Sequence, residues 1–354
     1  MYEEVTDRFG KTKQVRRKKL FFPDFYDYDY YFFQGVQDAE DFGKHMCVLK
    51  SRRKGYSFKC GSMCCRNYYF MPNSKSYVYV SNKQYLTEDG ILNKAWAYLD
   101  FIDKNTAWGK KRQVFDQMMH KRASFLVSDE FGNKIETGYK SEIIGVSLKD
   151  NPGSVRGKAG KLILFEEAGS FTELAAAWQV ARPSVEQDGI AYGLMLAFGT
   201  GGDEGSSFAS LKDMFYNPKG YNCLEFENIW DEAVSPDSKC GFFIPQYTNL
   251  DVRDDDNNRL YMDKDGNTLH KKAMDYVLSL RKEVIENATS QQAVDRYVAE
   301  QPITPREACL EFTGNIFPKK ELQNHLAFIR THKELQAHKQ VGDLIFDNDG
   351  NIQW

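Results

Sequence analysis

The chain has 354 residues, 42% of them hydrophobic and 27% charged, a composition that excludes disorder and supports a substantial buried core. Its formal net charge of -3 excludes a globally basic field, so contact with nucleic acid would rest on local basic clusters. The charged N-terminus, the lack of an apolar run long enough for a membrane span and the odd count of seven cysteines together predict a cytoplasmic protein with reduced thiols.

Short, continuous apolar runs recur along the chain, and such runs are typical of strands that are buried on both faces of a parallel sheet. Helix-like stretches separate several of them, at 90–104, 109–121 and 172–186. This alternation predicts an α/β fold, a mainly parallel central sheet flanked by helices, with its functional site at the carboxyl ends of the strands. The apolar runs are 46–49, 77–80, 143–148, 162–165, 194–198 and 242–244.

Turn residues predict several hairpins. Residues 124–140 read as two strands with a turn at Gly132-Asn133. The DKDG at 263–266 resembles the start of a calcium loop, but no Glu follows at the required position, so a hairpin turn is expected. Residues 342–354 have the pattern of a strand pair.

Two further segments predict helices. Residues 270–300 read as one or two helices that follow an acidic, turn-rich stretch. Cys60, Cys64 and Cys65 lack the spacing of metal ligands, so we expect them to be buried on a helix. Residues 24–34 are rich in aromatics, which would suit either a surface that stacks adenine or a helix packed on the core.

The stretch KSRRKGYSF, residues 50–58, has the features of a phosphate-binding loop that follows a strand. Gly55 permits a tight turn, Ser57 offers a hydroxyl for Mg²⁺, and the N–H groups of the following helix would converge on the anion. The usual position of the lysine is occupied by Tyr56, which leaves three alternatives: a lysine relocated to Lys50 at the root of the loop, a loop that has lost its function, or a chance match. The other loop residues expected to line the nucleotide are Ser51, Arg52, Arg53, Lys54, Tyr56 and Phe58.

Two later segments carry the other residues expected at the nucleotide site. GKLILFEEAGSF, residues 160–171, is a buried strand that ends in Glu166 and Glu167. In ATP-hydrolysing folds the first such acid holds Mg²⁺ through water and the second polarises the attacking water. Thr200 lies in a glycine-rich strand end suited to sense the γ-phosphate.

These motifs, in this order over about residues 20–318, resemble the ATPase domain of the large terminase of tailed bacteriophages, the motor that pumps DNA into the capsid. KSRRKGYS matches the version of the family's loop in which the lysine stands at its beginning. The stretch 151–169 is similar to the family's segment that leads into the acidic strand, and LAFGTGG at 196–202 to its coupling motif. QPITPREACLEFTGNIFP at 301–318 resembles the stretch that closes the ATPase region.

The resemblance implies a P-loop NTPase of the ASCE type with ATP and Mg²⁺ as cofactors. It departs from the family's pattern in the Glu at 166, where Asp is usual. The trans-acting arginine is not identified, and Arg122 and Arg156 are the candidates. The residues with implied roles are Lys50 and Ser57 for phosphate and Mg²⁺, Glu166 for the metal, Glu167 for the water, Arg52 for the γ-phosphate and Thr200 for coupling.

The resemblance also implies partners and a domain plan. Double-stranded DNA, a portal protein and a small terminase subunit would be the partners of a pentameric ring, docked on a procapsid in the host cytoplasm, with no membrane. Residues 1–250 would form the ATPase core, with 1–45 on the adenine side, and 251–318 a small lid. Residues 319–354 would begin a linker toward an absent nuclease domain, so nuclease activity is not expected.

Two other functions remain open from the sequence. The first is a catalytically silent P-loop module that docks to a portal or small terminase, with Tyr56 marking a lost lysine. The second is a helicase-like remodeller of nucleic acid, although nothing after residue 250 resembles a second motor domain.

Overall fold

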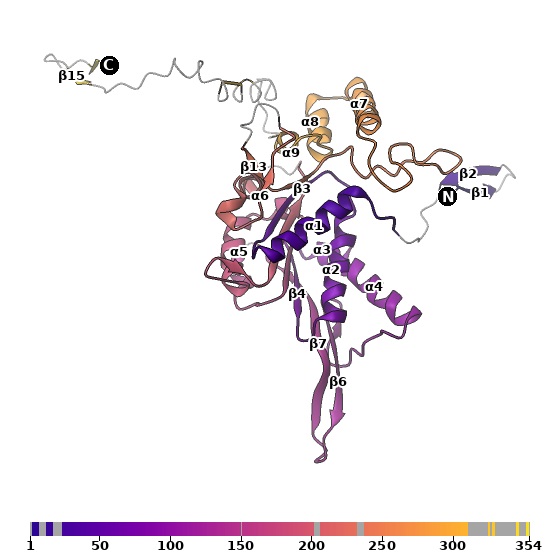
Figure 1. Ribbon diagram of the computed structural model, residues 1–354, viewed down its shortest axis with the longest axis vertical. Helices are drawn as coiled ribbons and strands as arrows, with labels where there is room; N and C mark the ends of the chain where they lie inside the picture. Colours follow the sequence, from indigo (N-terminus) through magenta and orange to yellow (C-terminus); the bar gives the residue numbers. More distant parts are fainter. Residues whose placement is uncertain are drawn as a thin grey trace.

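The computed structural model of the chain (Figure 1) describes residues 2–6, 12–16, 23–149, 151–201, 206–231, 237–310, 325, 328–329, 345–346 and 352–353. Its centre is an eight-stranded sheet with the order β14-β3-β11-β8-β4-β7-β6-β5. The strands from β14 to β7 in that order run parallel, and β6 and β5 are antiparallel to their neighbours. The strands of this sheet are β3 (Met46–Lys50), β4 (Lys75–Val80), β5 (Asp116–Gln117), β6 (His120–Ser128), β7 (Lys134–Ser147), β8 (Leu162–Glu166), β11 (Leu194–Gly199) and β14 (Phe242–Ile244).

Helices cover both faces of the sheet, and each face has its own apolar core. One core contains Phe32 and Tyr68, and the other contains Trp178 and Phe215. The described helices are α1 (Asp27–Asp41), α2 (Tyr56–Phe70), α3 (Gln84–Thr87), α4 (Ile91–Asn105), α5 (Leu174–Ala181), α6 (Ser206–Tyr216), α7 (His270–Asn287), α8 (Gln291–Glu300) and α9 (Pro305–Ala308). This is the α/β architecture that the sequence predicted, and the six predicted apolar runs all form strands of the central sheet.

The short elements pair locally. The antiparallel pairs are β1 (Tyr2–Thr6) with β2 (Thr12–Arg16), β9 (Glu186–Gln187) with β10 (Ile190–Ala191), β12 (Phe226–Glu227) with β13 (Lys239–Cys240), and β15 (Ile345–Phe346) with β16 (Ile352–Gln353). The last pair confirms the predicted strand pair near the end of the chain. The 3-10 turns are Pro152–Val155, Ala168–Ser170, Arg182–Ser184 and Pro218–Tyr221.

The hairpin of β6 and β7 is confirmed, and in Figure 1 it extends below the sheet while α7, α8 and α9 lie above it. Its turn is fixed by Asp129, whose carboxylate accepts backbone N–H groups from Phe131 and Asn133. The same local device forms at Asp263, whose carboxylate accepts the N–H of Asn267, so DKDG is a hairpin turn as expected.

Two predicted helices differ from the structure. Residues 109–121 are not helical, because this segment runs along β6: Gln113 donates its N–H to the carbonyl of Ser124, and β5 pairs with the start of β6. The helix predicted at 172–186 is shorter, since α5 ends at Ala181 and Pro183 follows, which cannot donate a helical hydrogen bond. In both places a neighbouring strand or proline outweighed the apolar periodicity.

The other helix predictions are confirmed. α4 matches the stretch predicted at 90–104, and residues 270–300 form two helices, α7 and α8. Cys60, Cys64 and Cys65 are buried on α2 as expected, and burial raises the pKa of each thiol. Within the described residues no helix is both long and apolar enough to cross a membrane.

Candidate nucleotide site

The predicted loop and the two acids meet at one edge of the sheet. β3 ends at Lys50 and β8 ends at Glu166, and β11, which ends beside Thr200, lies between these two strands. Because all three strands are parallel, their carboxyl ends open on the same edge. One strand, β11, therefore separates the loop strand from the acid strand.

Three contacts tie this edge together. Lys50 Nζ lies 3.3 Å from Glu167 Oε1. Ser57 Oγ donates to Glu166 Oε1 at 3.1 Å. Thr200 Oγ1 donates to Glu167 Oε2 at 3.4 Å. The cation, the two hydroxyls and the two carboxylates that the sequence singled out therefore form one cluster, although they come from three separate segments of the chain.

Tyr56, at the position where a phosphate-binding loop usually has its lysine, packs into the core. Its side chain is buried, and its ring centroid lies 4.8 Å from that of Phe32 on α1 and 5.6 Å from that of Phe198 on β11. The side chain at this position therefore enters the core between the sheet and α1, where an unpaired ammonium would be strongly disfavoured. Lys50, at the end of β3, reaches the carboxyl edge from the sheet itself.

Gly55 and Glu167 hold unusual backbone conformations at the two ends of the cluster. Gly55 has φ +70 just before α2 begins, in the left-handed region that glycine adopts without penalty. Glu167 has φ +48, which is uncommon for a residue with a side chain and costs of order 1–3 kcal/mol. Glu167, which contacts Lys50 and Thr200, is also the residue that the sequence analysis expects to polarise the attacking water.

Glu166 is the most enclosed of the charged groups in the cluster, with 2% of its surface exposed. Burial raises the pKa of its carboxyl to about 7, although hydrogen bonds from the Ile91 N–H and the Ser57 hydroxyl favour the charged form. A nearby divalent cation would counter this cost of burial. Glu167 is more open, with 30% of its side chain exposed.

The side chains of two predicted ligands, Lys54 and Tyr56, have other surroundings, and a contact of these residues with a phosphate stays a prediction. The Lys54 ammonium donates to the carbonyls of Gln246 and Thr248, at 2.8 and 2.5 Å, and burial lowers its pKa to about 7. It therefore holds the segment after β14 against the loop. The Tyr56 side chain is in the core, as described, so only the backbone of these two residues is available to a phosphate.

The remaining loop residues have other surroundings. Ser51 Oγ donates to Gln301 Oε1 at 2.7 Å, and Arg52 Nη1 lies 2.7 Å from Glu300 Oε2. Arg53 is exposed with φ +61. Phe58 is half exposed and faces α4, with the Lys94 ammonium 4.6 Å from its ring centroid.

Sequence reasoning missed the residues at the end of α8. Glu300 and Gln301 hold the start of the loop, and Arg52 also donates its backbone N–H to the carbonyl of Glu300 at 3.0 Å. The sequence feature that could have identified Gln301 is its place as the first residue of the QPITP segment, which resembles a motif of the terminase family. That segment is described to residue 310, and Gly202 of the coupling motif and residues 311–318 lie outside the described residues.

Gly201, in the predicted coupling motif, packs against the backbone of α8 and α9. A Cβ built on it would lie 2.2 Å from the carbonyl oxygen of Ala308 and 2.5 Å from that of Ala299. Backbone oxygens cannot rotate away, so Gly201→Ala should lower stability by about 1–3 kcal/mol through overpacking. Thermal unfolding measures this change. Gly153→Ala is the matched control, because its Cβ would approach only the side-chain oxygen of Asn151, and equal melting temperatures of the two variants would contradict the close packing.

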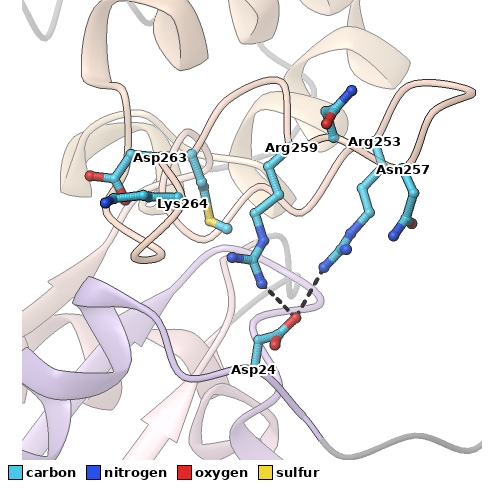
Figure 2. Close-up of a pocket in the computed structure, with 8 residues that line it drawn as sticks. Asp24, Arg253, Asn257, Arg259, Asp263 and Lys264 are labelled. Atoms are coloured by element: carbon cyan, nitrogen blue, oxygen red, sulfur yellow. Dashed lines mark hydrogen bonds and ion pairs between the residues drawn. The ribbon is translucent and has the colours of Figure 1, made fainter.

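A pocket of about 430 Å³ lies elsewhere, beside the segment that precedes α1 (Figure 2). Asp24 Oδ2 contacts Arg253 at 3.0 Å and Arg259 at 2.6 Å, so these arginines tie the acidic loop to the N-terminal side of α1. The pocket shares no lining residue with the loop at 50–58. The aromatic stretch at 24–34 is largely helical, in line with the predicted helix packed on the core. Adenine stacking there remains a prediction.

The candidate trans-acting arginines are placed differently. Arg122 lies on β6 and pairs with Glu136 and Glu142, on the antiparallel side of the sheet. Arg156 is exposed after the turn Pro152–Val155. Neither belongs to the cluster at the sheet edge, and a role for either stays a prediction.

Among solved structures, the chain is similar to the ATPase domain of the large terminase of Thermus phage P74-26, with a TM-score of 0.47 and 11% identity over 73% of this chain and 87% of that one. A mutant of that domain gives a TM-score of 0.48 and 10% identity over 80% and 99%. A large terminase from another thermophilic bacteriophage gives 0.33 and 12% over 51% and 39%. A scan of protein-family models and a search of curated proteins found no match.

Proposed function

We propose that this chain is a Mg²⁺-dependent ATPase, the motor domain of a large terminase that drives double-stranded DNA into a procapsid. The observation that carries the ATPase assignment is the paired geometry at the sheet edge, with Lys50 against Glu167 and Ser57 against Glu166. The order of the motifs along the chain, which resembles that of the terminase ATPase domain, supports the motor assignment.

The phosphates of ATP would bind at the loop between β3 and α2. The first N–H groups of α2, a helix of 15 residues, lack intrahelical partners and lie at the positive end of the helix dipole. Lys50 adds a full charge from the other side, and Arg52 a second one once it leaves Glu300. These groups suit a triphosphate, which carries its charge on several oxygens.

Ser57 and Glu166 fit Mg²⁺. Their oxygens are 3.1 Å apart in the structure, and Mg²⁺ prefers few protein oxygens together with water and substrate phosphates. The metal would neutralise charge on the phosphates during transfer. Ser57 would contribute its hydroxyl directly, and Glu166 would act through a bound water, a contact that also tolerates the longer side chain of Glu in place of the usual Asp.

Glu167 would orient the water that attacks the γ-phosphorus. In the structure its carboxylate is engaged by Lys50 and Thr200. A γ-phosphate would draw the Lys50 ammonium toward itself and release a carboxylate oxygen for the water. The water oxygen then bonds to phosphorus, the bond to the β–γ bridging oxygen breaks, and the water proton passes to Glu167 and on to phosphate.

Hydrolysis would be transmitted through the contacts of α8. Thr200 contacts Glu167, and the neighbouring Gly201 packs against the backbone of Ala299 and Ala308. A change at the γ-phosphate therefore has a short path to α8 and α9. The portal, the small terminase and a pentameric ring complete the proposal by resemblance, and DNA would be gripped through its phosphates in a salt-sensitive way.

The test is the thermal stability of the full chain with and without Mg-ATP. At a ligand concentration of about a hundred times Kd, binding should stabilise the folded state by roughly 2.7 kcal/mol and raise the melting temperature. ATP with EDTA should give a smaller shift, because the Ser57 and Glu166 oxygens would then face the phosphates without a metal. An unchanged melting temperature with Mg-ATP would favour the silent docking module.

A further inference from the structure

The carboxylate of Glu166 lies between the N-termini of two helices. From α2, the Ser57 hydroxyl donates to Oε1 at 3.1 Å. From α4, the backbone N–H of Ile91 lies 3.0 Å from Oε1 and 3.1 Å from Oε2. The proposed metal role accounts for the contact with Ser57, whereas the contact with Ile91 needs another explanation.

The N-terminus of α4 has no cap of its own. Its N-cap residue is Gly90, which has no side chain to accept a hydrogen bond, and no acidic residue occurs in the first turn. The first N–H groups of a helix need acceptors, and a carboxylate is favourable there because it faces the positive end of the helix dipole. Glu166, 75 residues later in the chain, supplies this acceptor.

The close approach of this carboxylate to the helix depends on the glycine at position 90. A Cβ on Gly90 would lie 2.8 Å from Glu166 Oε2 and 2.1 Å from the carbonyl oxygen of Tyr85. On α2, a Cβ on Gly61 would lie 3.1 Å from the backbone nitrogen of Ala95, so α2 and α4 pack closely at that point. The two helices therefore form one unit that presents the Ser57 hydroxyl and the Ile91 N–H to the same side chain.

We propose that Glu166 is a positioning residue for α4 as well as the metal acid: it caps α4, and α4 in turn aims the carboxylate at Ser57. The role of Glu166 as a metal ligand rests on the proposed function, whereas its role as the cap of α4 does not. Aspartate would fall roughly 1.5 Å short, the length of one carbon–carbon bond, and could not hold the Ile91 N–H without movement of β8. This explains why the chain has Glu where the resemblance leads one to expect Asp.

The test compares Glu166→Asp with Glu166→Gln in the full chain without nucleotide. Hydrogen exchange of the amides in α4 is measured, with the amides of α7 as an internal reference for global unfolding. In Glu166→Asp the Ile91 amide should exchange about two- to thirty-fold faster, the range expected for the loss of a helix cap. In Glu166→Gln the acceleration should be clearly smaller than in Glu166→Asp, because the side-chain oxygen still accepts the N–H and only the charge that faces the helix dipole is lost. Glu173→Asp, an exposed residue before α5, is the matched control for the shorter side chain.

The exchange rates test the cap, and the melting shift tests the metal role. Unchanged exchange in Glu166→Asp, or equally fast exchange in both variants, overturns the cap. Clearly faster exchange in Glu166→Asp than in Glu166→Gln supports it, whether or not the protein binds Mg-ATP. The melting shift with Mg-ATP, measured on the same samples, decides the metal role separately: a shift that Glu166→Gln loses supports it, and a wild type without a shift overturns the proposed function while leaving the cap intact.

Discussion

Lys50→Ala should remove ATP hydrolysis almost completely, lowering kcat/KM by about 10²–10³-fold, the effect typical of losing one preorganised charge-stabilising group. The variant takes away the cation that β3 aims at Glu167 and leaves no replacement at Lys54, since that ammonium is held by the carbonyls of Gln246 and Thr248. The fold should survive, because the partner carboxylate of Glu167 is partly exposed and can be hydrated. Steady-state phosphate release measures the loss, and the melting shift with Mg-ATP should also disappear.

Two controls separate this result from a general loss of charge or stability. Lys282→Ala removes an exposed lysine that pairs with Glu286 on the same helix, α7, and should leave hydrolysis unchanged. Lys54→Ala should lower the melting temperature of the nucleotide-free protein, because it removes a buried bridge to the segment after β14, yet it should retain a melting shift with Mg-ATP. If Lys54→Ala loses the shift and Lys50→Ala keeps it, the phosphate cation has been assigned to the wrong residue.

Glu167→Gln should lower kcat by about 10²–10⁴-fold while Mg-ATP still binds, because the amide cannot take the proton of the attacking water. The change keeps the size of the side chain. Its one oxygen can accept from Lys50 while its amide group donates to the Thr200 hydroxyl, so the geometry of the edge should be preserved. Single-turnover hydrolysis measures the chemical step, and the Mg-ATP melting shift checks that binding persists.

Glu173→Gln makes the same chemical change six residues later, on an exposed side chain, and should have the activity of the wild type. Wild-type turnover in Glu167→Gln would place the base elsewhere, and Glu166 would be the first residue to substitute. Loss of the melting shift together with hydrolysis would instead mean that Glu167 is needed for binding, which the proposed mechanism does not require.

The sequence by itself determined the framework of this protein. Continuous apolar runs such as 162–165 are long enough and apolar enough to report burial on both faces, and each became a strand of the sheet. Two local patterns were readable: Gly55 before a helix, and two acids at the end of a strand. Because parallel strands have their carboxyl ends at one edge of the sheet, the meeting of these segments could be predicted as well. The place of Lys50 at the end of a strand was also readable, whereas its role toward a phosphate stays a prediction.

The tertiary structure decided what depends on residues far apart in the chain. The segment 109–121 has an apolar pattern, but the edge of β6 offered backbone hydrogen bonds that the pattern could not show. Lys54 looks like a phosphate ligand in the sequence, and only the carbonyls of Gln246 and Thr248, 192 and 194 residues later, turn its ammonium inward. The same holds for Glu300 at Arg52 and for Ile91 at Glu166: periodicity and motif spacing describe neighbours along the chain, whereas these partners become neighbours only when the sheet and its helices have packed.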